Sequence, residues 1–255
     1  MVFKIFVHAV RLVVGHLGEA LRIGGLLYLV QFAVVLAVAL FAPVRPTAAS
    51  GFDPANLVVL LPIVVVGLVT NIWIAVAWHR YVLLDEMPGA VVAPFNGERM
   101  LAYFGNSLRL FLIALGIAIA VILVAVIAAT LSRGAQASSD LLVQLAPLVI
   151  YALIAIILYR LALILPASAV GKSIGLRDAW SATAGATGTI VGLAILSVLC
   201  VLVLDLPAML LGNSGAPFVW LGVVWQTAVG WIEVMVGVSI LTTLYGYYVE
   251  HRPIA

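Results

Sequence analysis

The segment LFLIALGIAIAVILVAVIAA, residues 110–129, runs for 20 residues without a charged side chain. The hydrocarbon core of a bilayer requires about 20 apolar residues of helix. In lipid, every backbone N–H and C=O must be satisfied within the spanning structure, which leaves helices or a closed barrel. A barrel strand would alternate polar and apolar residues over about 10 positions, and this run does not alternate. The segment therefore predicts a transmembrane helix.

The composition of the whole chain agrees with that prediction. Of 255 residues, 65% are hydrophobic and 9% are charged, against about 25% charged in an ordinary soluble domain. We therefore expect one all-α integral membrane domain over residues 1–255. The formal net charge of +2 is too small to indicate a nucleic-acid partner. Hydropathy predicts six transmembrane helices, near residues 23–42, 56–78, 108–131, 142–165, 188–206 and 218–243.

The lysines and arginines predict the orientation in the membrane. Of the 12 in the chain, only Arg45 and Arg133 fall in connections on one side, which leaves ten on the other. These ten lie before the first span, in the second and fourth connections, and in the C-terminal tail. Because cytoplasmic loops carry the excess of Lys and Arg, we expect both termini in the cytoplasm.

Three polar lead-ins precede spans on the predicted cytoplasmic side. In residues 1–22 the polar side chains recur at steps of three and four, which predicts an amphipathic helix lying in the membrane interface. Residues 94–109 and 173–189 resemble this segment. The cations that we expect to contact lipid headgroups are Lys4, Arg11, Arg22, Arg99, Arg109, Lys172 and Arg177.

The lead-ins also share a short pattern that suggests an internal repeat. GEALR at residues 18–22 matches GNSLR at 105–109 and, more weakly, GATGT at 185–189. The pattern predicts three parallel copies of a lead-in followed by a transmembrane hairpin, over residues 1–80, 90–165 and 172–248. The alternative is that any cytoplasmic loop before a helix changes from polar to apolar in this way.

Glu233 is the one charge-capable side chain near the middle of a predicted span. A charged group there costs at least about 3 kcal/mol, so such residues usually face other helices and have partners. Gln226 shares its helix face, and Asn71 and Gln31 lie at comparable depth, where either could hydrogen-bond the carboxyl. Because desolvation disfavours the charged form, we expect a neutral carboxyl. It serves either as a structural link between helices or as a proton or cation site in a transport path.

Motifs for catalysis, metal binding and nucleotide binding are missing from the sequence. It contains no phosphate-binding glycine loop, no Gly-x-Ser-x-Gly elbow and no His-Glu-x-x-His pair. We therefore expect no catalytic residues, no metal and no cofactor. The histidines occur singly at the predicted cytoplasmic boundary, where we expect them to be solvated; they are His8, His16, His79 and His251.

Three segments resemble a known group of proteins. They are AWHRYVLLDE at 77–86, YRLALILPASAVG at 159–171 with Ala179-Trp180 after it, and LTTLY at 241–245. The chain resembles uncharacterised six-helix inner-membrane proteins of proteobacteria, similar to the membrane domain associated with glycerophosphoryl diester phosphodiesterases. The resemblance implies the architecture and a bacterial inner-membrane location. It implies no active site, because the phosphodiesterase domain is a separate soluble barrel that no part of this chain could encode.

Three function classes follow from the sequence. The first is a non-enzymatic accessory, scaffold or lipid-organising membrane protein, with membrane lipids, other membrane proteins or a second copy of the chain as partners. The second is a transporter or channel for a small or lipidic substrate, with Glu233 as the proton-coupling site. The third is a membrane enzyme, which would need a cytoplasmic cleft lined by Asp85, Glu86, His79 and Arg80.

Overall fold

The computed structural model describes residues 1–41, 54–131, 154–212 and 216–254. Within these ranges the chain forms helices and connections, and no strand. Residues 154–161 are helical and are called helix 154–161 below. The other elements are α1 (Val2–Gly15), α2 (Leu17–Phe41), α3 (Pro54–Leu84), α4 (Gly97–Leu131), α6 (Ile164–Ala169), α7 (Leu176–Ala182), the 3-10 helix η1 (Ala184–Ala186), α8 (Thr187–Gly212) and α9 (Ala216–Tyr248).

Five of the helices are long and apolar enough to cross a membrane, which confirms the prediction of an all-helical chain with membrane-length helices. Much of their outer surface is apolar and exposed, as at Leu112, Ile122 and Val124 on α4, and so large an exposed apolar surface is unfavourable in water. The predicted span 142–165 lies mostly outside the described residues, and its described end belongs to the shorter apolar helix Ile154–Ala169. The five stretches are Leu17–Phe41, Val59–Leu84, Gly97–Val124, Ala184–Leu211 and Leu221–Tyr248.

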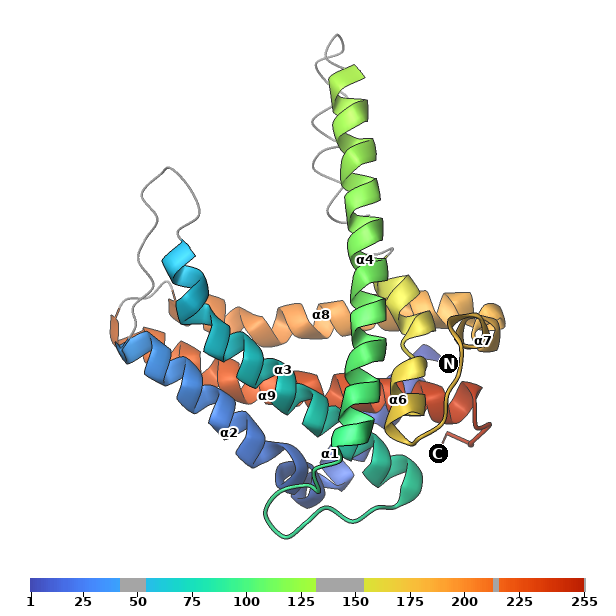
Figure 1. Cartoon of the computed structure of the whole chain (residues 1–255), viewed down its shortest axis with the longest axis horizontal. Coiled ribbons are helices and arrows are strands. Elements are labelled where there is room, and N and C mark those ends of the chain that lie inside the picture. Colours follow the sequence, from blue (N-terminus) through green and yellow to red (C-terminus); the bar gives the residue numbers. More distant parts are fainter. Residues whose placement is uncertain (42–53, 132–153, 213–215, 255) are drawn as a thin grey trace.

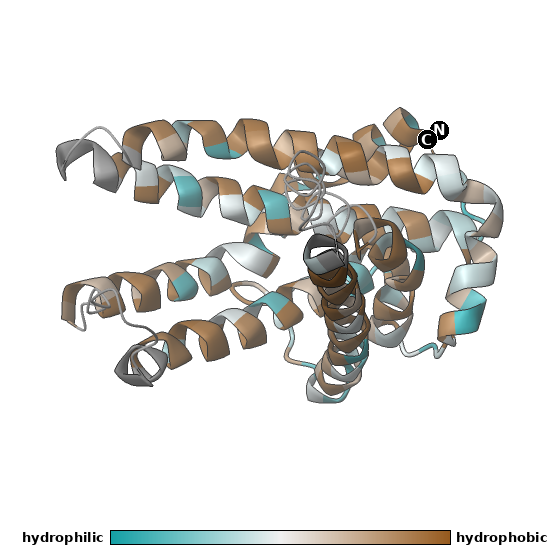
Figure 2. Ribbon diagram, turned by 90° about the horizontal axis from the view of Figure 1, so that it is seen from above, coloured by the Kyte–Doolittle hydropathy of each residue, from teal (hydrophilic) through white to brown (hydrophobic). Residues whose placement is uncertain are grey.

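The long helices pack as two pairs with α4 set across them. Helix α2 runs along α3, and α8 runs along α9. Helix α4 crosses α9 at a steep angle and packs on α3 and α6 near its N-terminal end (Figure 1). The two chain termini lie close together at one end of the molecule (Figures 1 and 2). Seen from above, apolar residues predominate along all the long helices (Figure 2).

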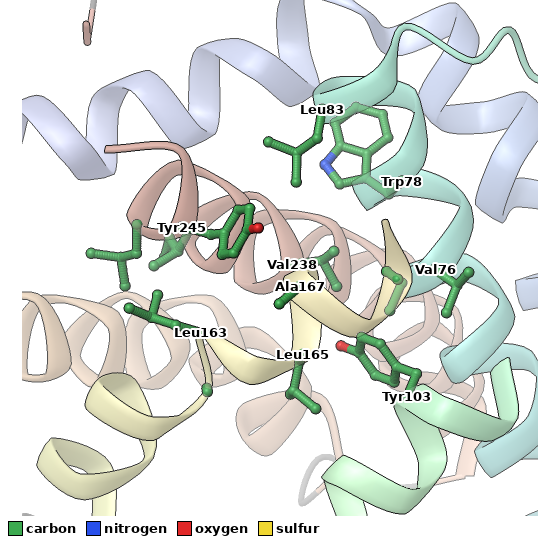
Figure 3. Close-up of a cluster of buried hydrophobic side chains, with 14 of the residues drawn as sticks. Val76, Trp78, Leu83, Tyr103, Leu163, Leu165, Ala167, Val238 and Tyr245 are labelled. Atoms are coloured by element: carbon green, nitrogen blue, oxygen red, sulfur yellow. The ribbon is translucent and has the colours of Figure 1, made fainter. Parts of the chain in front are cut away.

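Buried hydrophobic side chains cluster where α3, α4, α6 and α9 meet. Figure 3 shows Trp78, Tyr103, Leu165 and Tyr245 grouped around the α6 segment. Trp78 is fully buried, and its indole Nε1–H donates to Ser239 Oγ at 2.8 Å. A tryptophan can be buried completely because its single polar hydrogen has an acceptor.

Helix α6 is a short segment whose six residues are all buried. Helix 154–161 ends in a turn at residues 162–163, and α6 begins immediately after it. Pro166 lies in the first turn of α6, where a missing N–H breaks no helical hydrogen bond. The break therefore directs the chain inward, and α6 fills the space between α3, α4 and α9.

The three lead-ins take three different forms. The expected interface helix over residues 1–22 is wrong in its extent, because α1 ends at Gly15 and residues 17–22 begin α2. Helix α1 buries Ile5, Ala9 and Val13, spaced four apart, and packs on α9 and α8. Residues 97–109 are the first turns of α4, whereas residues 176–189 form α7, η1 and the start of α8. The threefold repeat stays a prediction.

Candidate functional site

Two cavities meet at Glu233 on α9. Cavity A, about 590 Å³, lies between α1, helix 154–161, α8 and α9. Cavity B, about 710 Å³, lies between α3, α4, residues 154–165 and α9. Both are lined by Ala155, Tyr159, Glu233 and Gly237. These four residues therefore separate two spaces whose volumes lie within the range of about 300–1,000 Å³ typical of ligand sites.

The lining of both cavities is almost entirely apolar. In cavity A the polar exceptions beside Glu233 are Tyr159, Ser197 and Cys200, and the Tyr159 hydroxyl donates to Ser197 Oγ at 2.8 Å. Apolar walls with few polar groups suit an apolar chain better than a hydrated ion, since each ion would lose its water without replacement ligands. The lining thus favours lipidic occupants.

The carboxyl of Glu233 lacks the partners that the sequence predicted. Its Oε1 atom is buried and makes no hydrogen bond within the described ranges. Asn71 lines cavity B with Glu233, but its Nδ2 donates to Gly67 O of its own helix at 2.7 Å. Gln31 Nε2 donates to Thr70 Oγ1 at 2.5 Å. Within the described residues the amide nitrogens of Asn71 and Gln31 thus donate to other acceptors, and neither hydrogen-bonds the Glu233 carboxyl.

Gln226 is paired with an acidic residue that the sequence interpretation missed. Its Nε2 donates to Asp205 Oδ1 at 2.9 Å, which links α9 to α8. The predicted fifth span ended at residue 206, just before Pro207, which placed Asp205 at the boundary between the span and the following connection. In the structure α8 continues through Pro207 to Gly212, and Asp205 lies within the membrane-length stretch. The apolar residues after Pro207 were the available signal.

The glycines on the face of α9 that carries Glu233 differ in their surroundings. A Cβ atom on Gly230 would contact the hydroxyl of Tyr28, so α2 approaches α9 closely at this point. A Cβ atom on Gly237 would meet nothing within 4 Å. Gly230 is therefore a packing position, whereas Gly237 leaves space that belongs to the cavities.

The cleft expected for a membrane enzyme is not formed by the four residues proposed for it. His79 is fully buried rather than solvated, and its Nδ1 lies 2.8 Å from Thr242 Oγ1. Arg80 forms an ion pair with Glu86 and donates to Ala169 O at 3.0 Å. A small cavity of about 40 Å³ touches Arg80 and Glu86 but neither His79 nor Asp85. The structure thus separates the groups that such a mechanism would combine.

The cations predicted to contact headgroups are mostly exposed. Lys4, Arg11, Arg22, Arg109, Lys172 and Arg177 lie at the surface. Arg99 is half-buried and lies 3.4 Å from Glu98. Lys172 Nζ donates to Glu250 Oε1 at 2.8 Å, and this hydrogen bond and the carboxylate charge raise the pKa of Lys172. Their contact with lipid stays a prediction.

Neither a metal site in the described ranges nor a comparison with known proteins indicates a function for this chain. Among the described residues, no group of three or more His, Cys, Asp or Glu side chains is placed to hold a metal ion. The resemblance to six-helix inner-membrane proteins therefore stays a prediction, and the two cavities carry the functional argument. The chain matches no protein-family model, no curated protein and no solved structure.

Proposed function

We propose that this protein is a non-enzymatic, lipid-organising membrane protein whose cavities A and B hold the acyl chains of membrane lipids. The observation that carries this proposal is the pair of large apolar cavities that share one wall at Glu233 and Gly237. It would act as an accessory or scaffold component, with lipids, other membrane proteins or a second copy of the chain as partners.

Packing energetics favour lipid as the occupant of these cavities. A cavity left empty forfeits dispersion contacts along its whole lining, and that loss grows with its volume. Between membrane-length helices the available filler is acyl chain, which is as apolar as the lining itself. The cavities reach α1 and α4, whose outward faces also expose apolar side chains such as Phe3 and Phe111. Chains from the bilayer would therefore fill both spaces at little cost.

In the proposed topology the chain crosses a bacterial inner membrane six times, including residues 142–165, and both termini lie on the cytoplasmic side. The closeness of the two termini supports an even number of crossings (Figure 1). The excess of Lys and Arg on one side supports the orientation. A cysteine introduced at residue 8 or 251 would be labelled by a membrane-impermeant maleimide only after cell lysis; labelling of intact spheroplasts would contradict this topology.

The cavities are tested by filling them from Gly237. Because a side chain there meets open space and glycine is a poor helix former by about 1 kcal/mol, Gly237→Leu should leave the fold intact. Gly116→Leu is the matched control, since Gly116 also has no neighbour within 4 Å but lines neither cavity. Native mass spectrometry of the purified proteins should show less co-purified phospholipid for Gly237→Leu alone. Equal lipid in both variants and the wild type would refute the proposal.

A second candidate function is proton-coupled transport of a lipidic or small substrate. The observation in its favour is the Glu233 carboxyl, which faces both cavities with one oxygen lacking a hydrogen bond within the described ranges. Glu233→Gln separates the candidates. Proton flux into proteoliposomes, followed with a trapped pH-sensitive dye, should disappear in this variant if the carboxyl carries protons. Absence of flux in the wild type, or equal flux in the variant, would remove this candidate.

A further inference from the structure

Arg160 is a buried cation without a counter-charge in the described part of the chain. It lies on helix 154–161 and is only 6% exposed. Its Nη2 donates to Thr187 Oγ1, and its Nε is buried without a hydrogen bond. The guanidinium carbon lies 4.5 Å from the centroid of the Trp180 ring. A guanidinium has five N–H donors, and Thr187 is its one acceptor among the described residues.

This arrangement is costly unless an anion completes it. A guanidinium stays charged at physiological pH, and a buried charge without an opposite charge is strongly destabilising. The Trp180 ring offers cation–π attraction but no hydrogen-bond acceptor. Asp178, on the same helix as Trp180, makes no ion pair with Arg160; its Oδ2 accepts the backbone N–H of Gly175 at 3.0 Å.

The start of α8 adds a second source of positive potential at the same place. Thr187, which accepts the hydrogen bond from Arg160, is the first residue of this 26-residue helix. The N-terminus of a helix carries partial positive charge and free N–H groups, which suit phosphate. A Cβ atom on Gly185 or Gly188 would meet nothing within 4 Å, so the backbone on this side of the helix start is open to a ligand.

We infer that Arg160, Thr187 and the start of α8 bind a phosphate-ester anion. The planar guanidinium is matched to phosphate oxygens, which it can bind through two parallel hydrogen bonds. The Nε–H would then gain the acceptor that it lacks in the described chain. The ring of Trp180 holds the guanidinium plane while the anion binds at its edge.

The phosphate belongs to a membrane phospholipid if the cavities hold acyl chains, and this step rests on the proposed function. Tyr159, next to Arg160 in sequence, lines cavities A and B. Ser197, which accepts the Tyr159 hydrogen bond, is ten residues along α8 from Thr187, or about 15 Å. A lipid with its chain in cavity A would thus extend along α8 towards its phosphate at the helix start.

The test measures ligand-dependent thermal stability of the full chain in a neutral detergent. The probes are inorganic phosphate, dihexanoyl phosphatidylglycerol and dihexanoyl glycerol, which lacks the phosphate. We expect saturable stabilisation by the phosphatidylglycerol and little by the glycerol. Arg160→Gln should weaken that binding about tenfold or more, the usual effect of losing a charge-assisted hydrogen bond. Arg252→Gln, which removes an equal charge from an exposed position in the C-terminal tail, should not.

Each outcome decides the inference. Saturable, Arg160-dependent binding of either phosphate-containing probe supports it, and inorganic phosphate acting as strongly as the lipid would assign the site to a soluble anion. Equal stabilisation by phosphatidylglycerol and dihexanoyl glycerol would overturn it, and this comparison uses wild-type protein, so a misfolded variant cannot obscure it. Equal binding by Arg160→Gln and Arg252→Gln would also overturn it. Lipid loss in Gly237→Leu would then still uphold the lipid cavities.

Discussion

Ser239 on α9 should contribute to stability far beyond the size of its side chain. Its hydroxyl accepts the indole N–H of Trp78 at 2.8 Å and donates to Met235 O at 2.8 Å. Trp78 and Ser239 are both fully buried. Ser239→Ala removes a single oxygen atom and leaves the indole N–H without an acceptor at a site that water does not reach. Leaving a buried donor unsatisfied costs about 1–3 kcal/mol.

Thr243→Val is the matched control on the same helix. The Thr243 hydroxyl is also buried, but it donates only to Ser239 O of its own helix. Removing this hydroxyl leaves no donor on another helix without an acceptor, so we expect the unfolding free energy to fall by less than about 1 kcal/mol. The two substitutions therefore differ in the fate of the partner group, while each removes one hydroxyl.

The assay is reversible unfolding of the purified protein in mixed micelles, followed by tryptophan fluorescence and circular dichroism. A double-mutant cycle with Trp78→Phe isolates the pair. Hydrogen bonds between helices in membranes couple by about 0.6 kcal/mol on average and about 1.7 kcal/mol at most, and we expect a value near the upper end because both groups are fully buried. A coupling free energy near zero, or a Thr243→Val variant as unstable as Ser239→Ala, would refute this reasoning.

Two further predictions concern close packing and an exposed ion pair. A Cβ atom on Gly24 would lie 2.9 Å from Trp231 Nε1 and 3.6 Å from Ile74 Cγ2, so Gly24→Ala should lower the unfolding free energy by about 1 kcal/mol net of helix propensity. Gly116→Ala, at a position with no neighbour within 4 Å, should raise the unfolding free energy by up to about 1 kcal/mol. Equal effects of the two substitutions in the same unfolding assay would contradict close packing at Gly24. Glu250 raises the pKa of Lys172 above 10.5, so the pair stabilises the protein below that pH and the benefit is lost as pH rises through the raised pKa. The melting temperatures of wild type and Lys172→Met should therefore converge as the pH rises above the raised pKa of Lys172, and a difference that stays constant with pH would exclude the ion pair as its source.

Much of the fold could be predicted from the sequence, because the membrane restricts the choices. Runs such as residues 110–129 have no soluble alternative, and lipid requires that their backbone hydrogen bonds close within each helix. The five membrane-length helices accordingly fall where hydropathy places them. The end of α1 was harder to predict. Gly15 and Gly18 flank the break at His16, but Gly24 and Gly25 lie inside α2 without breaking it, so glycine alone does not identify a helix end.

The polar partners show what only the tertiary structure decided. The sequence by itself identified Glu233, Gln226, Asn71 and Gln31 as the polar groups at membrane depth, since hydropathy determines depth along each helix. It could not assign their partners, because a partner depends on how each helix is rotated about its axis and which neighbour packs against it. Gln226 pairs with Asp205 of α8, and Arg160 reaches the start of that same helix. Those pairings, and the cavities beside them, arise from side-chain packing between different helices, on which hydropathy carries no information.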